Sequence, residues 1–183
     1  RMRDSRSLQI GSTWWIGLIM KIILSLFTLL VISSQLFADD DAARLKELNA
    51  YWAGVSRAVG TGDFAGYVAT CHDEGVLVSG KRRTSYPLAK ALTGWKKEFD
   101  QTKAGKMKAG VEFRFAQRFG DGETAHETGM FLYSSTDAEG VVTSAYIHFE
   151  ALLVKRDGDW KILMEYQKSE GAKEDWEKLA KLD

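Results

Sequence analysis

The stretch ETAHETGMFLYSSTDAEGVVTSAYIHFEALLVKRDGDWKILMEY, residues 123–166, decides the fold. It contains three runs that are typical of β-strands, and Asp157-Gly158 joins the last two. Asp-Gly between alternating apolar residues is the strongest short-range signal for a β-hairpin. We therefore expect a two-residue turn at this dipeptide and an antiparallel ribbon on both sides of it.

The turn sets the register of this hairpin. It predicts Phe149 opposite Tyr166 on one face and Glu150 opposite Glu165 on the other. Because side chains alternate between the two faces of a strand, a slip of one residue would exchange the faces. The first face is apolar or aromatic, whereas the second carries the acids. An antiparallel sheet usually turns its polar face toward water, so we expect the aromatic face to line the interior.

Helices are predicted before this stretch and strands around it. Apolar residues at three- and four-residue spacing predict a helix over residues 39–59. Helix-capping signals at Asp63 and Pro87 predict two more, over residues 64–72 and from Pro87 to about residue 102. The predicted strands are residues 76–78, 111–119, 124–134, 141–155 and 160–168, with a loop at 81–85 and a short C-terminal helix within 171–182.

Composition argues against several classes of function. Residues 1–38 hold four of the 25 basic and one of the 25 acidic side chains, so the remaining chain carries a net charge of −3. No basic cluster carries interleaved aromatic residues, which argues against nucleic-acid binding. Cys71 is the single cysteine, so the chain has neither an internal disulfide nor a cysteine pair for zinc. It is more typical of a small core residue than of a nucleophile. No cofactor and no metal are therefore expected.

The N-terminal segment is typical of a secretory signal peptide. From Met20, Lys21 provides a short basic region, residues 22–32 an apolar run, and Leu36-Phe37-Ala38 a cleavage site. We expect cleavage after Ala38 and a secreted or periplasmic protein that has no membrane contact after cleavage.

This prediction divides the chain into two parts. Residues 1–38 would be an upstream extension plus the signal peptide, and residues 39–183 a single domain. The alternative is a retained N-terminal membrane anchor, because residues 14–32 are long enough to span a bilayer if the lysine within them is tolerated.

Helices followed by an antiparallel meander form an α+β arrangement. The chain has Gly62-Asp63-Phe64 after its first helix, Gly120-Asp121-Gly122 before a strand with Glu127-Thr128-Gly129, and KRDGDWKI at residues 155–162. In these motifs, over residues 42–170, it resembles the nuclear transport factor 2-like superfamily, and within it SnoaL-like and ketosteroid-isomerase-like domains. The resemblance implies a cone-shaped, curved antiparallel sheet wrapped around three N-terminal helices, with a pocket between them. It also implies a homodimer formed through the outer surface of the sheet.

The resemblance does not name a reaction, because this superfamily contains both enzymes and non-catalytic domains. The tyrosine and aspartate of ketosteroid isomerases would fall at Val55 and at Val78 or Ser79. The pocket arginines of calmodulin-dependent kinase association domains would fall at Met130 and Ala151. None of these residues matches, so neither chemistry is expected, and whether the protein is an enzyme stays open.

The aromatic face of the predicted sheet supplies a candidate pocket for a small apolar molecule, since an apolar cavity with a few polar groups is the usual small-molecule site. Its candidate residues are His126, Tyr166, Gln117, Thr128, Met130, Phe149, Met164 and Trp95, and the helices could add Trp52 and Tyr67. One hypothesis is a lyase or isomerase with His126 as general base and Tyr166 as donor. The alternatives are a core histidine hydrogen-bonded to Gln117 and a core tyrosine with its hydroxyl at the rim.

The opposite face gives a second candidate site, formed by Glu127, His148, Glu150 and Glu165. Carboxylates that face each other need water, a shared proton, an arginine or a metal. His148 and Glu150 could supply two metal ligands. The alternative is a solvated surface on which Arg114 and Arg118 balance the glutamates. Such a surface could also make the protein an interaction module.

Overall fold

The N-terminal helix packs against the sheet through the stripe that its periodicity predicts. A computed structural model describes residues 40–182, and the first of these, 40–61, are helical. Leu48, Trp52 and Val55 lie three or four residues apart and are buried in the core. The predicted signal peptide and its cleavage site lie outside the described residues. No helix within residues 40–182 is long and apolar enough to cross a bilayer.

Two shorter helices follow. Helix α2 (Phe64–Ala69) begins where the Asp63 carboxylate accepts a hydrogen bond from the Gly66 N–H at 2.9 Å. It ends before the predicted residue 72 because the carbonyl of Thr70 accepts a hydrogen bond from the Ile162 N–H, which draws the chain into the sheet. Helix α3 (Leu88–Lys103) begins directly after Pro87, one residue later than predicted.

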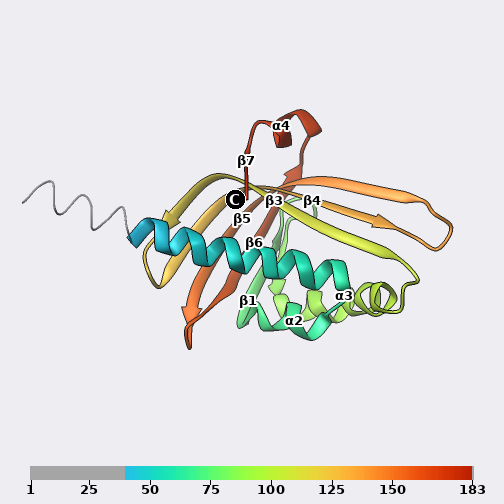
Figure 1. Ribbon diagram of the computed structural model, residues 1–183, viewed down its shortest axis with the longest axis horizontal. Helices are drawn as coiled ribbons and strands as arrows, with labels where there is room; N and C mark the ends of the chain where they lie inside the picture. Colours follow the sequence, from blue (N-terminus) through green and yellow to red (C-terminus); the bar gives the residue numbers. More distant parts are fainter. Residues whose placement is uncertain (1–39, 183) are drawn as a thin grey trace, which may run out of the picture. The chain divides into compact units, whose positions relative to one another are not determined.

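Seven strands form one curved sheet in the order β2-β1-β6-β5-β4-β3-β7 (Figure 1). β1 pairs with β6 in parallel, and all other neighbours are antiparallel. The strands are β1 (Cys71–Ser79), β2 (Thr84–Pro87), β3 (Lys108–Gly120), β4 (Thr124–Thr136), β5 (Val142–Arg156), β6 (Asp159–Glu170) and β7 (Ala180–Lys181). Two expectations are corrected: the predicted loop at 81–85 contains the start of β2, and the C-terminal helix is limited to α4 (Lys173–Glu177), since β7 pairs with β3.

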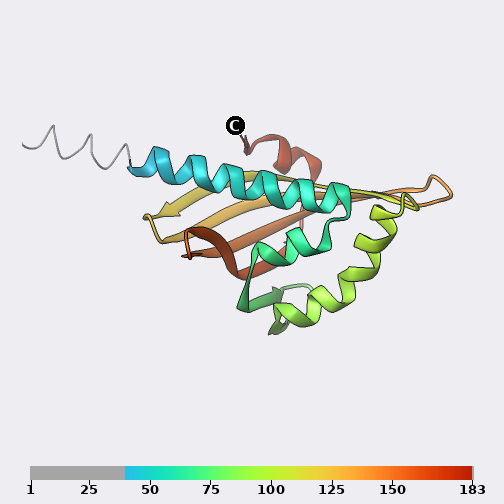
Figure 2. The same ribbon diagram turned by 60° about the horizontal axis from the view of Figure 1, so that its bottom comes forward.

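The helices divide between the two faces of the sheet. The N-terminal helix, α2 and α3 lie on one side, whereas α4 lies on the other (Figure 2). We call the first side the pocket face and the second the outer face. Phe149, Ala151 and Leu153 of β5 are buried on the pocket face, in the same hydrophobic cluster as Leu48 and Trp52. The predicted inward orientation of this strand is therefore confirmed.

The predicted register of the β5–β6 hairpin holds from the turn to Ile162 and fails from Leu163 onward. Leu153 pairs with Ile162, as predicted, but Leu152 pairs with Met164, so Leu163 has no partner. Such a one-residue β-bulge moves every later side chain of that strand to the opposite face. Phe149 consequently pairs with Gln167, and Glu150 pairs with Tyr166. The predicted pairs Phe149–Tyr166 and Glu150–Glu165 are wrong.

Gly120-Asp121-Gly122 predicts a two-residue turn at Asp121-Gly122 that would place Phe113 opposite Met130, and the β3–β4 hairpin differs from this prediction. Its turn is longer than two residues, because the Asp121 carboxylate accepts hydrogen bonds from the N–H groups of Glu123 and Thr124. A further irregularity lies between Phe115 and Gln117. Phe113 therefore pairs with Phe131 rather than with Met130, and Phe115 pairs with Gly129. The longer turn moves the register by two residues and leaves the faces unchanged, whereas the one-residue irregularity exchanges the two faces of β4 relative to Phe113 and Phe115.

Candidate ligand-binding site

An aromatic cavity of about 290 Å³ lies between the pocket face of the sheet and the helices. Both layers contribute to its wall. The lining includes Tyr51, Trp52 and Val55 from the N-terminal helix, Tyr67 from α2, Trp95, Glu98 and Phe99 from α3, and Phe113, Phe131, Tyr133, Ala145, Phe149, Glu165 and Gln167 from the sheet.

The aromatic rings support one another. The Trp52 ring lies 4.4 Å from Phe113 and 5.7 Å from Phe149, measured between ring centroids. The Tyr67 ring lies 5.1 Å from Phe99 and 6.0 Å from Trp95. Tilted and edge-on pairs at these separations are favourable beyond their area of contact. The wall is thus built from interlocked rings.

Glu165 and Gln167 bring the polar groups of β6 into this apolar space. Both point inward because they follow the bulge at Leu163. The Gln167 side-chain amide donates a hydrogen bond to Glu165 Oε1 at 2.7 Å. Burial raises the pKa of the Glu165 carboxyl, and the hydrogen bond from Gln167 only partly opposes this shift. The cavity therefore favours a neutral carboxylic acid when nothing compensates its charge.

Three further ionisable groups lie near this carboxyl. The Tyr51 hydroxyl donates a hydrogen bond to the Thr70 carbonyl at 3.1 Å. Burial raises the pKa of Tyr51 and of Tyr67 well above the ordinary value, and Glu165 raises both further. Burial also raises the pKa of the Cys71 thiol to about 12. The two phenols remain protonated donors at neutral pH, and the thiol is a poor nucleophile.

The rim of the cavity is polar. The Tyr133 hydroxyl donates a hydrogen bond to the exposed Glu98 carboxylate at 3.3 Å. Burial, followed by the Glu98 charge, raises the pKa of Tyr133 to about 12. These residues place a second carboxylate at the cavity, far less enclosed than Glu165.

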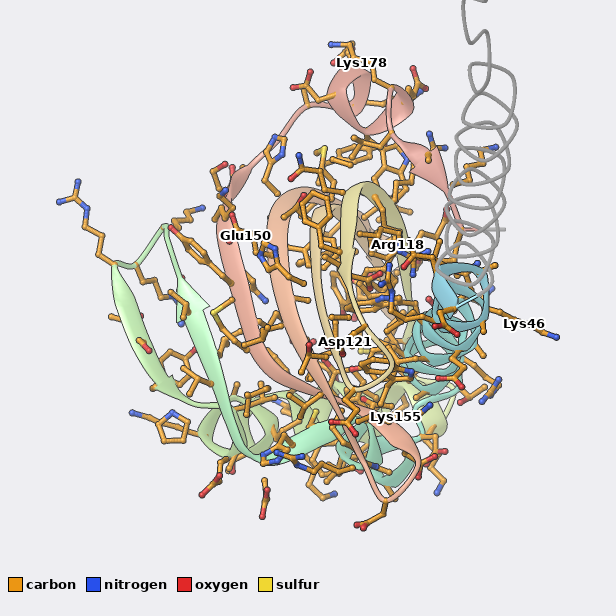
Figure 3. The ribbon with its side chains drawn as sticks, turned by 90° about the vertical axis from the view of Figure 1, so that its left-hand side faces the viewer. Lys46, Arg118, Asp121, Glu150, Lys155 and Lys178 are labelled. Carbon is orange, nitrogen blue, oxygen red and sulfur yellow. The ribbon has the colours of Figure 1, made fainter. Side chains whose placement is uncertain are left out.

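An ion pair behind the cavity holds Trp52 in place. Glu127 is fully buried and accepts hydrogen bonds from the Trp52 indole N–H and from Arg118. Arg118, labelled in Figure 3, also donates to Asn49 of the N-terminal helix. The predicted place of Glu127 on the acidic outer face is therefore wrong.

The structure separates the predicted pocket residues. Phe149 and Trp95 line the cavity, as do Trp52 and Tyr67. The others do not, because the irregularity between Phe115 and Gln117 and the bulge at Leu163 exchange the faces of β4 and β6 relative to the prediction. The residues placed on the outer face instead are Gln117, His126, Thr128, Met130, Met164 and Tyr166.

The predicted acidic site on the outer face is not assembled. Glu150 lies on this face (labelled in Figure 3), but Glu165 lies on the other side of the sheet. Lys168 pairs with Glu150 at 2.6 Å, and this hydrogen bond is the main cause of the lowered pKa of Glu150. His126 lies 3.7 Å from Glu150. Lys168 thus balances this acid, in place of the predicted Arg114 and Arg118.

His148 lies apart from this group. A side chain at Gly171 would come within 2.7 Å of its Nε2 atom, so the segment leading to α4 covers it. Across residues 40–182, no group of three or more His, Cys, Asp or Glu side chains is placed to hold a metal ion.

Sequence reasoning missed Tyr51 and Gln167 and placed Glu165 on the wrong face. Tyr51 lies one helical turn before Val55, so both line the cavity. The bulge left one signal in the sequence: Ile162, Leu163 and Met164 are three consecutive apolar residues, which interrupt the alternation of β6. Such a break is compatible with a bulge but does not locate it.

The fold and the cavity together define a class of protein: an α+β domain in which helices and a curved sheet enclose an apolar space. No protein-family profile and no curated protein matches the chain. Solved structures do match it. One is an NTF-2 like protein of unknown function from Shewanella oneidensis MR-1, with 16% identity, a TM-score of 0.51, and coverage of 66% of this chain and 95% of that chain.

Two other similar structures also have low identity. A conserved protein from Planctomyces limnophilus DSM 3776 has 12% identity and a TM-score of 0.58, over 68% of this chain and 94% of that chain. A variant of a protein of unknown function from Mycobacterium tuberculosis has 16% identity and a TM-score of 0.57, over 73% of this chain and 75% of that chain. The chain thus has the nuclear transport factor 2-like fold, which confirms the predicted fold class.

Proposed function

We propose that this domain binds a small, mainly apolar molecule in the aromatic cavity. One observation carries the proposal: about 290 Å³ of space is lined by interlocked rings and holds a single enclosed carboxyl, Glu165. Binding sites for small molecules have this composition, in which apolar walls supply affinity and a few polar groups fix orientation. The Glu165–Gln167 pair would orient the ligand, and the rings would bury its apolar part.

A proton-transfer reaction of the isomerase or lyase type is the second candidate. The hypothesis built on His126 and Tyr166 is not retained, because both side chains lie on the outer face. Glu165 is the observation that favours catalysis, since burial raises the pKa of this enclosed carboxyl and so lets it hold a proton at higher pH than a free carboxyl does. Turnover that is lost in Glu165→Gln while ligand binding persists would select this candidate.

We also propose that the mature protein is exported and forms a homodimer. The sequence from Met20 to Ala38 supports export, and the resemblance in sequence motifs supports dimerisation. Native mass spectrometry of protein recovered from the producing cell tests both. The expected result is a subunit that begins at Asp39 and a complex with twice the mass of that subunit. A monomer would contradict the proposed homodimer, and a subunit that retains residues 14–32 would contradict the proposed export with cleavage.

Binding is tested by titration of propylbenzene, a small neutral probe, followed by ¹⁵N–¹H NMR. We expect chemical-shift changes at cavity residues such as Phe149. Changes at outer-face residues alone are not expected. Ala145 lines the cavity, so Ala145→Trp should fill it and abolish the shifts.

The matched control is Ser144→Trp, which places the same ring on the same strand but on the other, exposed face. This variant should bind like the wild type. Equal binding by both variants, or no binding by the wild type, would overturn the proposed function.

A further inference from the structure

The charged residues that line the cavity are all of one sign. Glu165 lies within the cavity and Glu98 at its rim, and no Lys, Arg or His side chain of the described chain lines it. The cavity thus combines negative charge with an apolar wall. A ligand of matching chemistry would carry a positive charge on an apolar body.

Glu165 has one oxygen that the protein leaves without a partner. Oε1 accepts a hydrogen bond from Gln167, whereas within residues 40–182 no donor contacts Oε2, and no ion pair involves this carboxylate. The Gln167 amide is neutral, so it satisfies an acceptor without balancing the charge. An isolated carboxylate is costly in an apolar environment, and an ammonium group at Oε2 would remove that cost.

The aromatic wall is suited to the same kind of ligand. Nine of the 21 lining residues are aromatic, and among them are Trp52, Tyr67 and Trp95. The faces of such rings attract cations, and a cage of rings is a recurrent way to hold an organic ammonium ion. The rings would therefore add to the attraction exerted by Glu165 and would also bury the apolar part of the ligand.

We propose that the cavity recognises an organic amine, with its ammonium group against the free oxygen of Glu165 and its apolar body among the aromatic rings. This inference rests on the proposed function, because it names the class of ligand for the same cavity. A neutral apolar ligand would satisfy the proposed function but not this inference, which allows the two to be tested separately.

The test compares 2-phenylethylammonium with propylbenzene, which has a methyl group in place of the ammonium. Dissociation constants are measured at pH 8 for the wild type, Glu165→Gln and the outer-face control Glu150→Gln. A charge-assisted hydrogen bond within the cavity should make the wild type bind the amine about tenfold more tightly than propylbenzene. Glu165→Gln should bind the two probes with about equal affinity, and Glu150→Gln should keep the preference.

Several outcomes would overturn the inference. One is a wild type that binds propylbenzene as tightly as the amine, which would leave the proposed function intact. Another is a folded Glu165→Gln variant that retains the preference. Binding of neither probe would overturn the inference and the proposed function together. If Glu165→Gln did not fold, the wild-type comparison and the Ala145→Trp variant, which should bind neither probe, would decide.

Discussion

Gln167 donates a hydrogen bond of 2.7 Å to Glu165 inside the aromatic cavity, and both side chains point inward from the same strand. They do so because Leu163 bulges out of the β5–β6 ladder. One extra residue in the strand thus gives the cavity its carboxyl.

The raised pKa of Glu165 predicts a distinctive dependence of stability on pH. In the unfolded chain this carboxyl titrates near its ordinary value of 4.5, whereas the folded protein keeps the proton to higher pH. In that window the unfolded state binds fewer protons, so the free energy of unfolding falls as pH rises from 4.5 through the raised pKa. Urea unfolding between about pH 4 and 8 should show that Glu165→Gln gains stability over the wild type across this window.

Glu150→Gln is the control for this experiment, because Lys168 lowers the pKa of Glu150. The change that Glu150→Gln makes in the free energy of unfolding should have the opposite sign to that of Glu165→Gln. The wild type's advantage over Glu150→Gln should be present above pH 4.5 and shrink as pH falls through the lowered pKa. A difference between Glu165→Gln and the wild type that is constant with pH would contradict the placement of Glu165.

Cys71 should react slowly with iodoacetamide in the folded protein. Burial raises the pKa of its thiol from 9.0 to about 12, so the thiolate fraction at pH 8 falls by about a thousandfold. Mass spectrometry of the alkylated protein over time measures the rate, and the urea-unfolded protein provides the reference. Alkylation of the folded protein at the unfolded rate would show that this thiol is accessible and ionised.

Gly129 is required where β3 and β4 approach each other. A Cβ at this position would overlap the Arg114 carbonyl oxygen and lie 2.9 Å from Phe115 Cα. Gly129→Ala should therefore destabilise the fold by more than about 2 kcal/mol, the scale of overpacking in a core. Gly94→Ala in α3 is the matched control, since no atom lies within 4 Å of the added carbon. It should stabilise the helix by about 0.5–1 kcal/mol, and thermal unfolding measures both variants.

Arg118 and Glu127 form an ion pair whose loss should be costly. The Glu127 side chain is fully buried and that of Arg118 is 17% exposed, so Arg118→Met leaves a buried carboxylate without its cation. Removal of one partner of such a pair costs about 3–5 kcal/mol. Chemical denaturation should show this loss, and a smaller one for Arg118→Met combined with Glu127→Leu.

Lys155 provides the comparison for this ion pair, and Figure 3 labels both Lys155 and Arg118. It pairs with Glu47 of the N-terminal helix at 2.6 Å, but the two side chains are 25% and 46% exposed. Lys155→Met should cost less than about 1 kcal/mol, as solvent-exposed pairs do. Equal losses in Arg118→Met and Lys155→Met would contradict the role of burial.

The order of elements could be predicted from the sequence alone. Apolar spacing predicted the N-terminal helix, Asp63 and Pro87 predicted the starts of α2 and α3, and Asp157-Gly158 predicted the last hairpin. These signals are local, since a cap or a tight turn acts on residues a few positions apart. The inward face of β5 followed from its alternation, so Phe149 was placed correctly.

The residues of the site were decided by the tertiary structure. β6 lies between β5 and β1, and Leu163 is left unpaired in its ladder with β5. That single unpaired residue turns Glu165 inward and Tyr166 outward. The irregularity between Phe115 and Gln117 of β3 did the same to His126 on β4. Alternation fixes which residues share a face of one strand, but a strand's register against its neighbours depends on packing across the whole sheet.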